Sequence, residues 1–137
     1  MLFGKYADCS GTQGINSTTI PVLIAHGTDD KIISYSGQSL IAHKEEITNP
    51  NVEYYVESGV QGGHDSIWHS KRSAEYKEEI NAKLAEIKKI KDDKERETAM
   101  KELAESVDND LYSEVNEELM SNIVRMYNDA LKIKEKK

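Results

Sequence analysis

The chain contains 137 residues, 37% of them hydrophobic and 31% charged, and its formal net charge is −7 at pH 7. This length allows one domain at most, with a thin hydrophobic core. The lack of a basic cluster outside the C-terminal lysines argues against a nucleic-acid partner, because phosphate binding needs a concentrated positive face. The single cysteine, Cys9, excludes an internal disulfide and a thiolate metal site.

The first strand is predicted by an apolar run that follows a polar segment. Residues 5–19 are rich in Gly, Ser, Thr and Asn, which indicates a loop. Residues 20–25, Ile-Pro-Val-Leu-Ile-Ala, are apolar and partly β-branched, which suits a parallel strand covered on both faces. Pro21 is acceptable there because it stands near the start of the strand. The polar residues 26–31 then form the loop at the carboxyl end of this strand.

A helix and a second strand are predicted next. Ser34 or Ser36 is a suitable cap for a helix that runs to about Ile47. Residues 52–56, Val-Glu-Tyr-Tyr-Val, indicate the second strand, and residues 57–63 indicate a loop. A right-handed crossover makes the two strands parallel and brings the loops that follow them to the same edge of the sheet. In open α/β sheets this edge is where ligand chemistry collects.

Two apolar series at helical spacing indicate helices in the charged segment between about residues 70 and 110. A polar break over residues 91–98 separates them, and Asp92 or Asp93 is a suitable cap for the second helix, so a helical hairpin is predicted. One long solvated helix is the alternative, because no Gly or Pro forces a turn. The apolar positions are Tyr76, Ile80, Leu84 and Ile87, and then Ala99, Leu103 and Val107.

The last helix is predicted to begin after Asn116, which caps it, while Glu117 and Glu118 complement the positive end of the helix dipole. Its apolar face is broad enough to pack on a sheet. The apolar stripe is Leu119, Ile123, Met126, Ala130 and Ile133, and it is widened by Val124, Tyr127 and Leu131. Lysines that suit the negative end are Lys132, Lys134, Lys136 and Lys137.

An aspartate and a histidine fall in the two loops that the predicted crossover brings together. Asp30 follows the first strand, and His64 stands in Gly62-Gly63-His64-Asp65 after the second. A histidine can act as a general base, and a carboxylate can orient its ring and stabilise the imidazolium form. The two glycines before His64 permit a sharp turn that aims its ring inward. We interpret Asp30 and His64 as an acid–base pair; the alternatives are a turn-capping aspartate and a surface histidine.

No clear nucleophile accompanies this pair. A Gly-x-Ser-x-Gly elbow occurs nowhere in the 137 residues. Ser39 begins like an elbow but lacks the second glycine, and Cys9 and Ser10 lack a preceding strand. A metal site built from His26, His64 and nearby carboxylates has no helical histidine spacing to support it. The sequence therefore predicts the acid and the base of a catalytic triad without its nucleophile.

The segment from Ile20 to Asp65 resembles the C-terminal part of the α/β-hydrolase family, close to its serine-aminopeptidase and lysophospholipase-like members. The resemblance is carried by residues 20–33, Ile-Pro-Val-Leu-Ile-Ala-His-Gly-Thr-Asp-Asp-Lys-Ile-Ile, by Pro50-Asn51-Val52 and by Gly62-Gly63-His64-Asp65. In this family an aspartate after a late strand is the triad acid and a late Gly-His carries the base. The resemblance thus implies these roles for Asp30 and His64.

The implied fold is of the α/β class, the C-terminal portion of an α/β-hydrolase fold with about two parallel strands. The resemblance divides the chain into a core segment at 1–70, a charged helical insertion at 71–112 and a closing amphipathic helix at 113–137. The implied function is that of a serine hydrolase fragment acting on ester or amide bonds of small ester, lipid or peptide substrates, with no cofactor or metal. The alternative is a non-catalytic interaction module or the partner-binding half of a split protein.

We also expect association and a cytoplasmic location. The predicted strands would pair, in an intact fold, with earlier strands that this chain lacks, so a homo-oligomer or a complementing partner chain is expected. No apolar run is long enough to cross a membrane. Residues 1–3 have neither the basic start nor the apolar stretch of a signal peptide.

Overall fold

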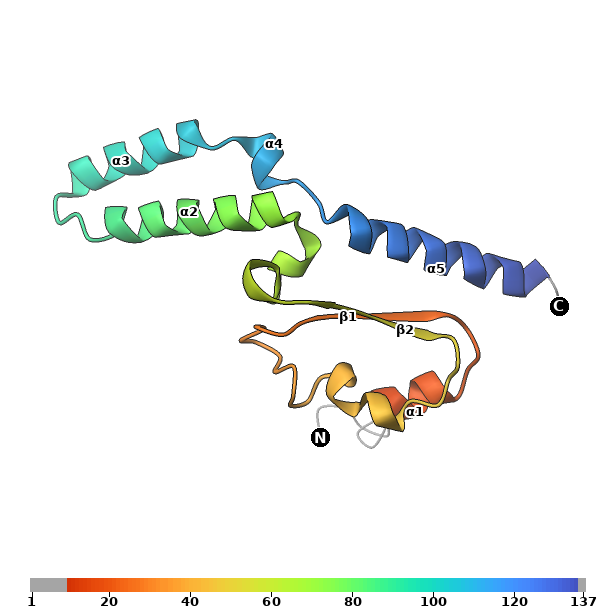
Figure 1. The fold of residues 1–137 in the computed structure, drawn as a ribbon. Helices are drawn as coiled ribbons and strands as arrows, with labels where there is room; N and C mark the ends of the chain where they lie inside the picture. Colours follow the sequence, from red (N-terminus) through yellow and green to blue (C-terminus); the bar gives the residue numbers. More distant parts are fainter. Residues whose placement is uncertain (1–9, 136–137) are drawn as a thin grey trace, which may run out of the picture.

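The computed structural model describes residues 10–135, with side chains as far as residue 132. It is a mixed α/β structure with a parallel pair of strands at its centre (Figure 1). The helix α5 lies along one side of the strands, short helices lie on the other side, and a helical hairpin extends from one end. Cys9, residues 1–3, Lys136 and Lys137 lie outside the described residues, as does the side chain of Ile133.

The sheet consists of β1 (Val22–Gly27) and β2 (Val52–Glu57), which pair in parallel with Ala25 opposite Tyr55. Both predicted strands and their parallel pairing are confirmed. Strand β1 begins after Pro21 because proline has no backbone N–H to donate. The ladder starts instead with the N–H of Val22, which donates to the carbonyl oxygen of Asn51 over 3.0 Å.

Helix α5 (Glu117–Glu135) covers one face of the sheet and closes the core. Leu119 has no exposed surface, and it lies in a cluster with Tyr55 and Ile67. The predicted cap is confirmed, since the Asn116 Oδ1 atom accepts from the N–H of Leu119 over 3.1 Å. The residues that widen the stripe do not pack on the sheet: Val124, Tyr127 and Leu131 remain 59%, 63% and 59% exposed.

Two parts of the N-terminal half differ from the prediction. The segment predicted as a loop contains helix α1 (Gly11–Asn16), because Ser10 and Gln13 form a capping box that outweighs the two helical glycines. The predicted helix beginning at Ser34 or Ser36 is a short 3₁₀ element, η2 (Leu40–Glu46), capped by Ser39. The preceding residues form a turn in which the N–H of Gly37 donates to Ser34 O, so the helix starts later.

The charged segment forms the predicted hairpin. Helix α2 (Lys71–Ile87) runs out and α3 (Asp93–Ser106) runs back beside it, which excludes one long helix (Figure 1). The Asp92 Oδ1 atom caps α3 by accepting from the N–H of Glu95 over 2.9 Å. Helix α2 buries Ser73, Ala74 and Ile80. No residue of α3 is buried.

Short elements connect these parts. The loop after β2 contains the 3₁₀ turns η3 (Gly59–Gln61) and η4 (Ser66–Trp68), and α4 (Asn109–Tyr112) returns the chain from α3 to α5. Within residues 10–135, no helix combines the length and apolarity that a membrane span requires.

Candidate functional site

The two loops at the carboxyl ends of β1 and β2 are in direct backbone contact. The N–H of Asp29 donates to the carbonyl oxygen of Gly62 over 2.9 Å. A Cβ atom at Gly27 would lie 2.0 Å from this same oxygen, so only glycine fits there. Gly62 has a φ of −78°, an ordinary right-handed value, which shows that its freedom to turn is not used. Gly27 and Gly62 act by permitting close approach of the two loops, and the prediction that Gly62 and Gly63 aim the His64 ring inward stays a prediction.

Asp29 fastens the same two loops through its side chain. Its Oδ2 atom accepts from the N–H of Gly59 over 2.9 Å and from the hydroxyl of Thr28 over 2.8 Å. Gly59 has the positive φ of 63° that favours glycine. This arrangement holds the loop after β2 against the loop after β1, and it sets the distance between the residues that follow.

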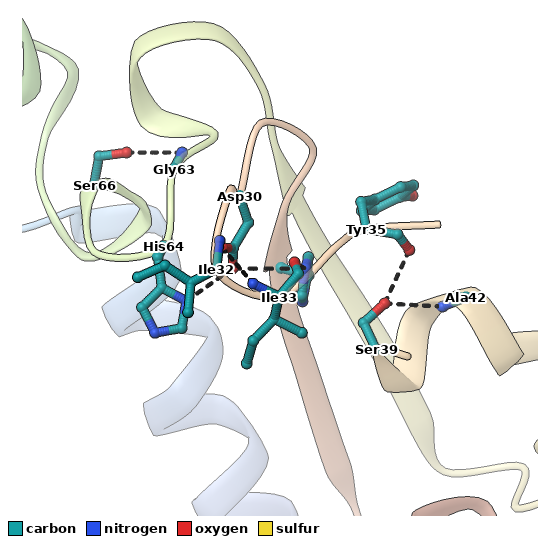
Figure 2. A network of polar contacts seen from close by, with 10 residues as sticks. Asp30, Ile32, Ile33, Tyr35, Ser39, Ala42, Gly63, His64 and Ser66 are labelled. Carbon is teal, nitrogen blue, oxygen red and sulfur yellow. Dashed lines mark hydrogen bonds and ion pairs between the residues drawn. The ribbon is translucent and has the colours of Figure 1, made fainter. Parts of the chain in front are cut away.

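Asp30 and His64 meet across this contact. The His64 Nδ1 atom donates to Asp30 Oδ2 over 2.8 Å (Figure 2). The other carboxylate oxygen, Oδ1, accepts from the N–H groups of Ile32 and Ile33 over 2.8 and 2.9 Å. The side chain of Asp30 is 4% exposed and that of His64 is 39% exposed. The carboxylate is therefore fixed and buried, whereas the imidazole reaches solvent.

The electrostatics of the pair follow from these contacts. Burial opposes ionisation of Asp30, but the N–H of Ile33, the His64 ring and the N–H of Ile32 outweigh it and lower the pKa of Asp30 to about 2. The hydrogen bond to Asp30 raises the pKa of His64. Because an ionised carboxylate only accepts, His64 carries its proton on Nδ1. In the neutral ring the second nitrogen, Nε2, points away from Asp30 and is free to accept a proton (Figure 2).

His26 has a structural position beside this pair. Its Nε2 atom donates to the carbonyl oxygen of Ile33 over 3.0 Å and lies 3.8 Å from Asp30 Oδ2. The ring therefore supports the turn that holds Asp30. In the part of the chain that the structure describes, no group of three His, Cys, Asp or Glu side chains is placed to hold a metal ion.

The pair opens onto a cavity of about 540 Å³, with His64 in its wall. Its size is that of small-molecule sites. Helix α2 of the hairpin contributes to the same wall, with Ala74, Lys77 and Asn81 along one side of the helix. The further lining residues are Asp29, Lys31, Ile32, Gly59, Val60, Gly63, Asp65, Ser66, His69, Glu78 and Tyr112.

Sequence reasoning missed a second polar cluster in this wall. Lys77 Nζ lies 2.6 Å from His69 Nε2 and 4.5 Å from the centroid of the Tyr112 ring. Burial and then the charge of Lys77 lower the pKa of His69, and burial lowers the pKa of Lys77. The helical spacing of residues 74, 77, 78 and 81 placed them on one face, but nothing in the sequence showed that this face meets His64.

The nucleophile candidates of the sequence are not placed for attack. Ser39 is buried, donates to Tyr35 O and caps η2 (Figure 2), and Ser10 caps α1. Cys9 lies outside the described residues. Ser66 lines the cavity, but its Oγ accepts from the N–H of Gly63 over 2.9 Å. Among the described residues, no serine is hydrogen-bonded to His64.

Comparison with known proteins adds no relative. Neither the family models, nor the curated proteins, nor the solved structures contain a match to this chain. The functional argument therefore rests on the geometry of the loops, the pair and the cavity.

Proposed function

We propose that this chain is the acid-and-base half of an acyl hydrolase of the α/β-hydrolase type. The observation that carries the proposal is the 2.8 Å contact between His64 Nδ1 and the buried carboxylate of Asp30 at the ends of two parallel strands. Asp30 is held by backbone N–H groups, as a residue that orients a base requires. His64 remains accessible beside a cavity of small-molecule size.

In the proposed reaction, His64 Nε2 accepts the proton of a serine hydroxyl as that oxygen attacks an ester or amide carbonyl. The imidazolium then returns the proton to the leaving group. Asp30 keeps the Nδ1–H tautomer and stabilises the positive charge that forms on the ring. The serine and the backbone N–H donors of an oxyanion hole come from a segment outside this sequence. In this proposal the sheet is the C-terminal part of a larger one.

The test is an activity measurement on a longer protein. The sequence encoded immediately before Met1 is read for a Gly-x-Ser-x-Gly strand–turn–helix, and the joined protein is offered a nitrophenyl ester and a fluorophosphonate probe. We expect labelling at that serine. We expect hydrolysis to fall roughly 10⁴-fold on Asp30→Asn and at least as far on His64→Ala, since the triad acts as a unit.

His43→Ala is the matched control, because His43 pairs with Glu46 at the surface and does not line the cavity. Its activity should equal that of the wild type. The isolated 137-residue chain should show no labelling. A longer protein that has the elbow but hydrolyses the ester equally well without His64 contradicts the proposal, and so does labelling of a serine within this chain.

The second candidate is a non-catalytic interaction module, and it is favoured by one observation. Val124, Tyr127 and Leu131 form an exposed apolar strip along α5, on a helix whose other side already covers the sheet. Such strips mark contact surfaces. If no elbow is encoded nearby and the chain is inert, binding through this strip becomes the better account.

A further inference from the structure

The cavity beside His64 contains a cation that lacks a counter-charge. Lys77 makes one hydrogen bond in the described part of the chain, to His69 Nε2, and its Nζ lies over the ring of Tyr112. Neither partner supplies a negative charge, because burial and the neighbouring ammonium lower the pKa of His69 and Tyr112 contacts Nζ through its aromatic ring. No carboxylate of the described residues lies within 4.0 Å of Lys77 Nζ.

The acidic residues of the cavity wall do not neutralise this ammonium. Asp29 is engaged by the hydroxyl of Thr28 and the N–H of Gly59. Asp65 and Glu78 line the cavity but form no ion pair with Lys77 within 4.0 Å; burial lowers the pKa of Lys77 and outweighs the charge of Asp65, which raises that pKa. A partly buried charge is costly unless it is paired. A negatively charged group that enters the cavity would supply the missing partner.

We propose that Lys77, supported by His69 and Tyr112, is the anion-binding group of a substrate subsite, and that the substrate is an ester or amide bearing a free carboxylate. The proposal rests on the hydrolase function proposed above and names its substrate class. A single negative charge fits better than a phosphate dianion, because the wall carries two cations, Lys31 and Lys77, against the carboxylates of Asp29, Asp65 and Glu78, and each added negative charge increases the repulsion.

The position of the subsite relates this binding to the chemistry. Lys77 belongs to α2, whereas His64 belongs to the loop after β2, and the two line one cavity of about 540 Å³. A substrate that holds its carboxylate at Lys77 is thereby kept against the wall that carries the base. Binding at a distance from the reacting bond is a common means of orienting a substrate.

The experiment is a pair of NMR titrations of the purified 137-residue chain with monomethyl glutarate and dimethyl glutarate. These esters share a backbone and differ in one free carboxylate. We expect the monoester to bind roughly tenfold more tightly, as one charge-assisted contact predicts, and to shift the signals of His69 and His64. Inorganic phosphate should bind more weakly than the monoester.

Lys77→Met keeps the aliphatic stem over Tyr112 and removes the charge, so it should abolish the preference for the monoester. Lys83→Met is the matched control, because Lys83 is an exposed lysine of α2 that does not line the cavity. Equal affinity of the wild type for both esters overturns the proposal without any variant. So does an unchanged preference in folded Lys77→Met, or tighter binding of phosphate.

Binding needs no nucleophile, which separates this proposal from the hydrolase function. If the charge preference is found but the longer protein is inactive with intact His64, the hydrolase proposal fails alone. If the longer protein hydrolyses neutral and charged esters equally well, the subsite proposal fails alone.

Discussion

The two oxygens of the Asp30 carboxylate have separate tasks. Oδ1 accepts from the N–H groups of Ile32 and Ile33, which fixes the rotation of the carboxyl group, and Oδ2 is thereby aimed at His64. The imidazole is the more exposed partner. Its orientation therefore depends on a carboxylate that the backbone holds in place, and a change at Asp30 should be detected directly at His64.

The first prediction follows from this dependence. In Asp30→Asn the neutral amide no longer stabilises the imidazolium, so the pKa of His64 should fall towards its ordinary value, as measured by NMR titration of the ring protons. His43→Ala is the control, because His43 pairs with Glu46 away from the cavity, and it should leave the pKa of His64 as in the wild type. A pKa of His64 that is unchanged by the substitution would mean that Asp30 does not stabilise the protonated imidazole.

The same pair predicts how stability depends on pH. The pKa of Asp30 is lowered to about 2, so its contribution is present above its unfolded pKa of about 3.9 and is lost as the pH falls through the folded value. The pKa of His64 is raised, so its contribution is complete below about 6.5 and is lost as the pH rises through the folded value. Urea unfolding should therefore show His64→Gln most destabilised near pH 5.5, and least destabilised at pH 9.5.

At the scale of elements, the contact between the two loops decides where the pair lies. A Cβ atom at Gly27 would lie 2.0 Å from Gly62 O, which is too close for two non-bonded atoms. Neither atom can move away by rotation of a side chain, because the oxygen belongs to the backbone and the Cβ is attached directly to it. The predicted cost of Gly27→Ala is about 1–3 kcal/mol, or more if the loops separate, because overpacking forces backbone shifts. The hydrogen bond between Asp30 and His64 should be lost together with this stability, and both can be followed by urea unfolding and NMR.

Gly14→Ala is the matched control for this substitution. A Cβ atom at Gly14 meets nothing within 4 Å, and the residue lies inside α1. Alanine there should leave stability unchanged or raise it by up to about 1 kcal/mol, since alanine favours the helix. Equal effects of the two substitutions would show that the close approach at Gly27 is not what the glycine provides.

The closing helix gives a fourth prediction. Leu119 is fully buried between Tyr55 and Ile67, so Leu119→Ala should lower the free energy of unfolding by roughly 2–5 kcal/mol. Val124 lies on the same helix but is 59% exposed, and Val124→Ala should cost no more than about 0.5 kcal/mol. Denaturant unfolding of the two variants measures the difference. Similar losses would mean that α5 is not seated on the sheet by Leu119.

The sequence predicted correctly the elements whose residue pattern matches the way they pack in the structure. The apolar runs of β1 and β2 and the Asn116 cap of α5 are of this kind. Helix α1 was missed because glycine content outweighed the Ser10 capping box, and η2 was placed too early because Ser39, not Ser34 or Ser36, caps it. Local composition does not show which of several nearby serines caps a helix.

The candidate site also has a part that the sequence predicted and a part that it did not. Asp30 and His64 stand at the ends of two parallel strands, so topology alone predicted that they would meet, and the 2.8 Å contact agrees. Their catalytic role stays a prediction. The contact between Lys77 and His69 was not predicted, because it depends on how the chain bends between η4 and α2. That bend leaves no short-range pattern in the sequence.

At the scale of the whole molecule, the structure leaves apolar side chains and strand edges exposed. The described sheet has two strands, each with one unpaired edge, and Tyr54 and Val56 of β2 are about two-fifths exposed. Two-stranded sheets are marginal on their own. Together with the exposed apolar strip of α5, these surfaces favour association of the chain with another copy when no other partner is present.

The fifth prediction is that the purified chain is not a stable monomer. Sedimentation equilibrium at micromolar concentration should give a mass above 15.5 kDa, and the thermal transition should depend on concentration. Tyr127→Glu should reduce association because it places a charge in the apolar strip, whereas Ser121→Glu, on the polar side of α5, should not. A monomeric mass with a concentration-independent, cooperative transition would show that the chain completes its own core.

The hairpin has a consequence for how such a protein can evolve. Helix α2 contributes the cavity wall with Lys77, yet its companion α3 buries no residue and is held apart from the sheet (Figure 1). Substitutions or length changes along the outer hairpin therefore leave the loops of Asp30 and His64 untouched. Under the proposed function, sequence and length should therefore vary first in α3, whereas substitutions that change substrate selectivity should fall on the α2 residues of the cavity wall.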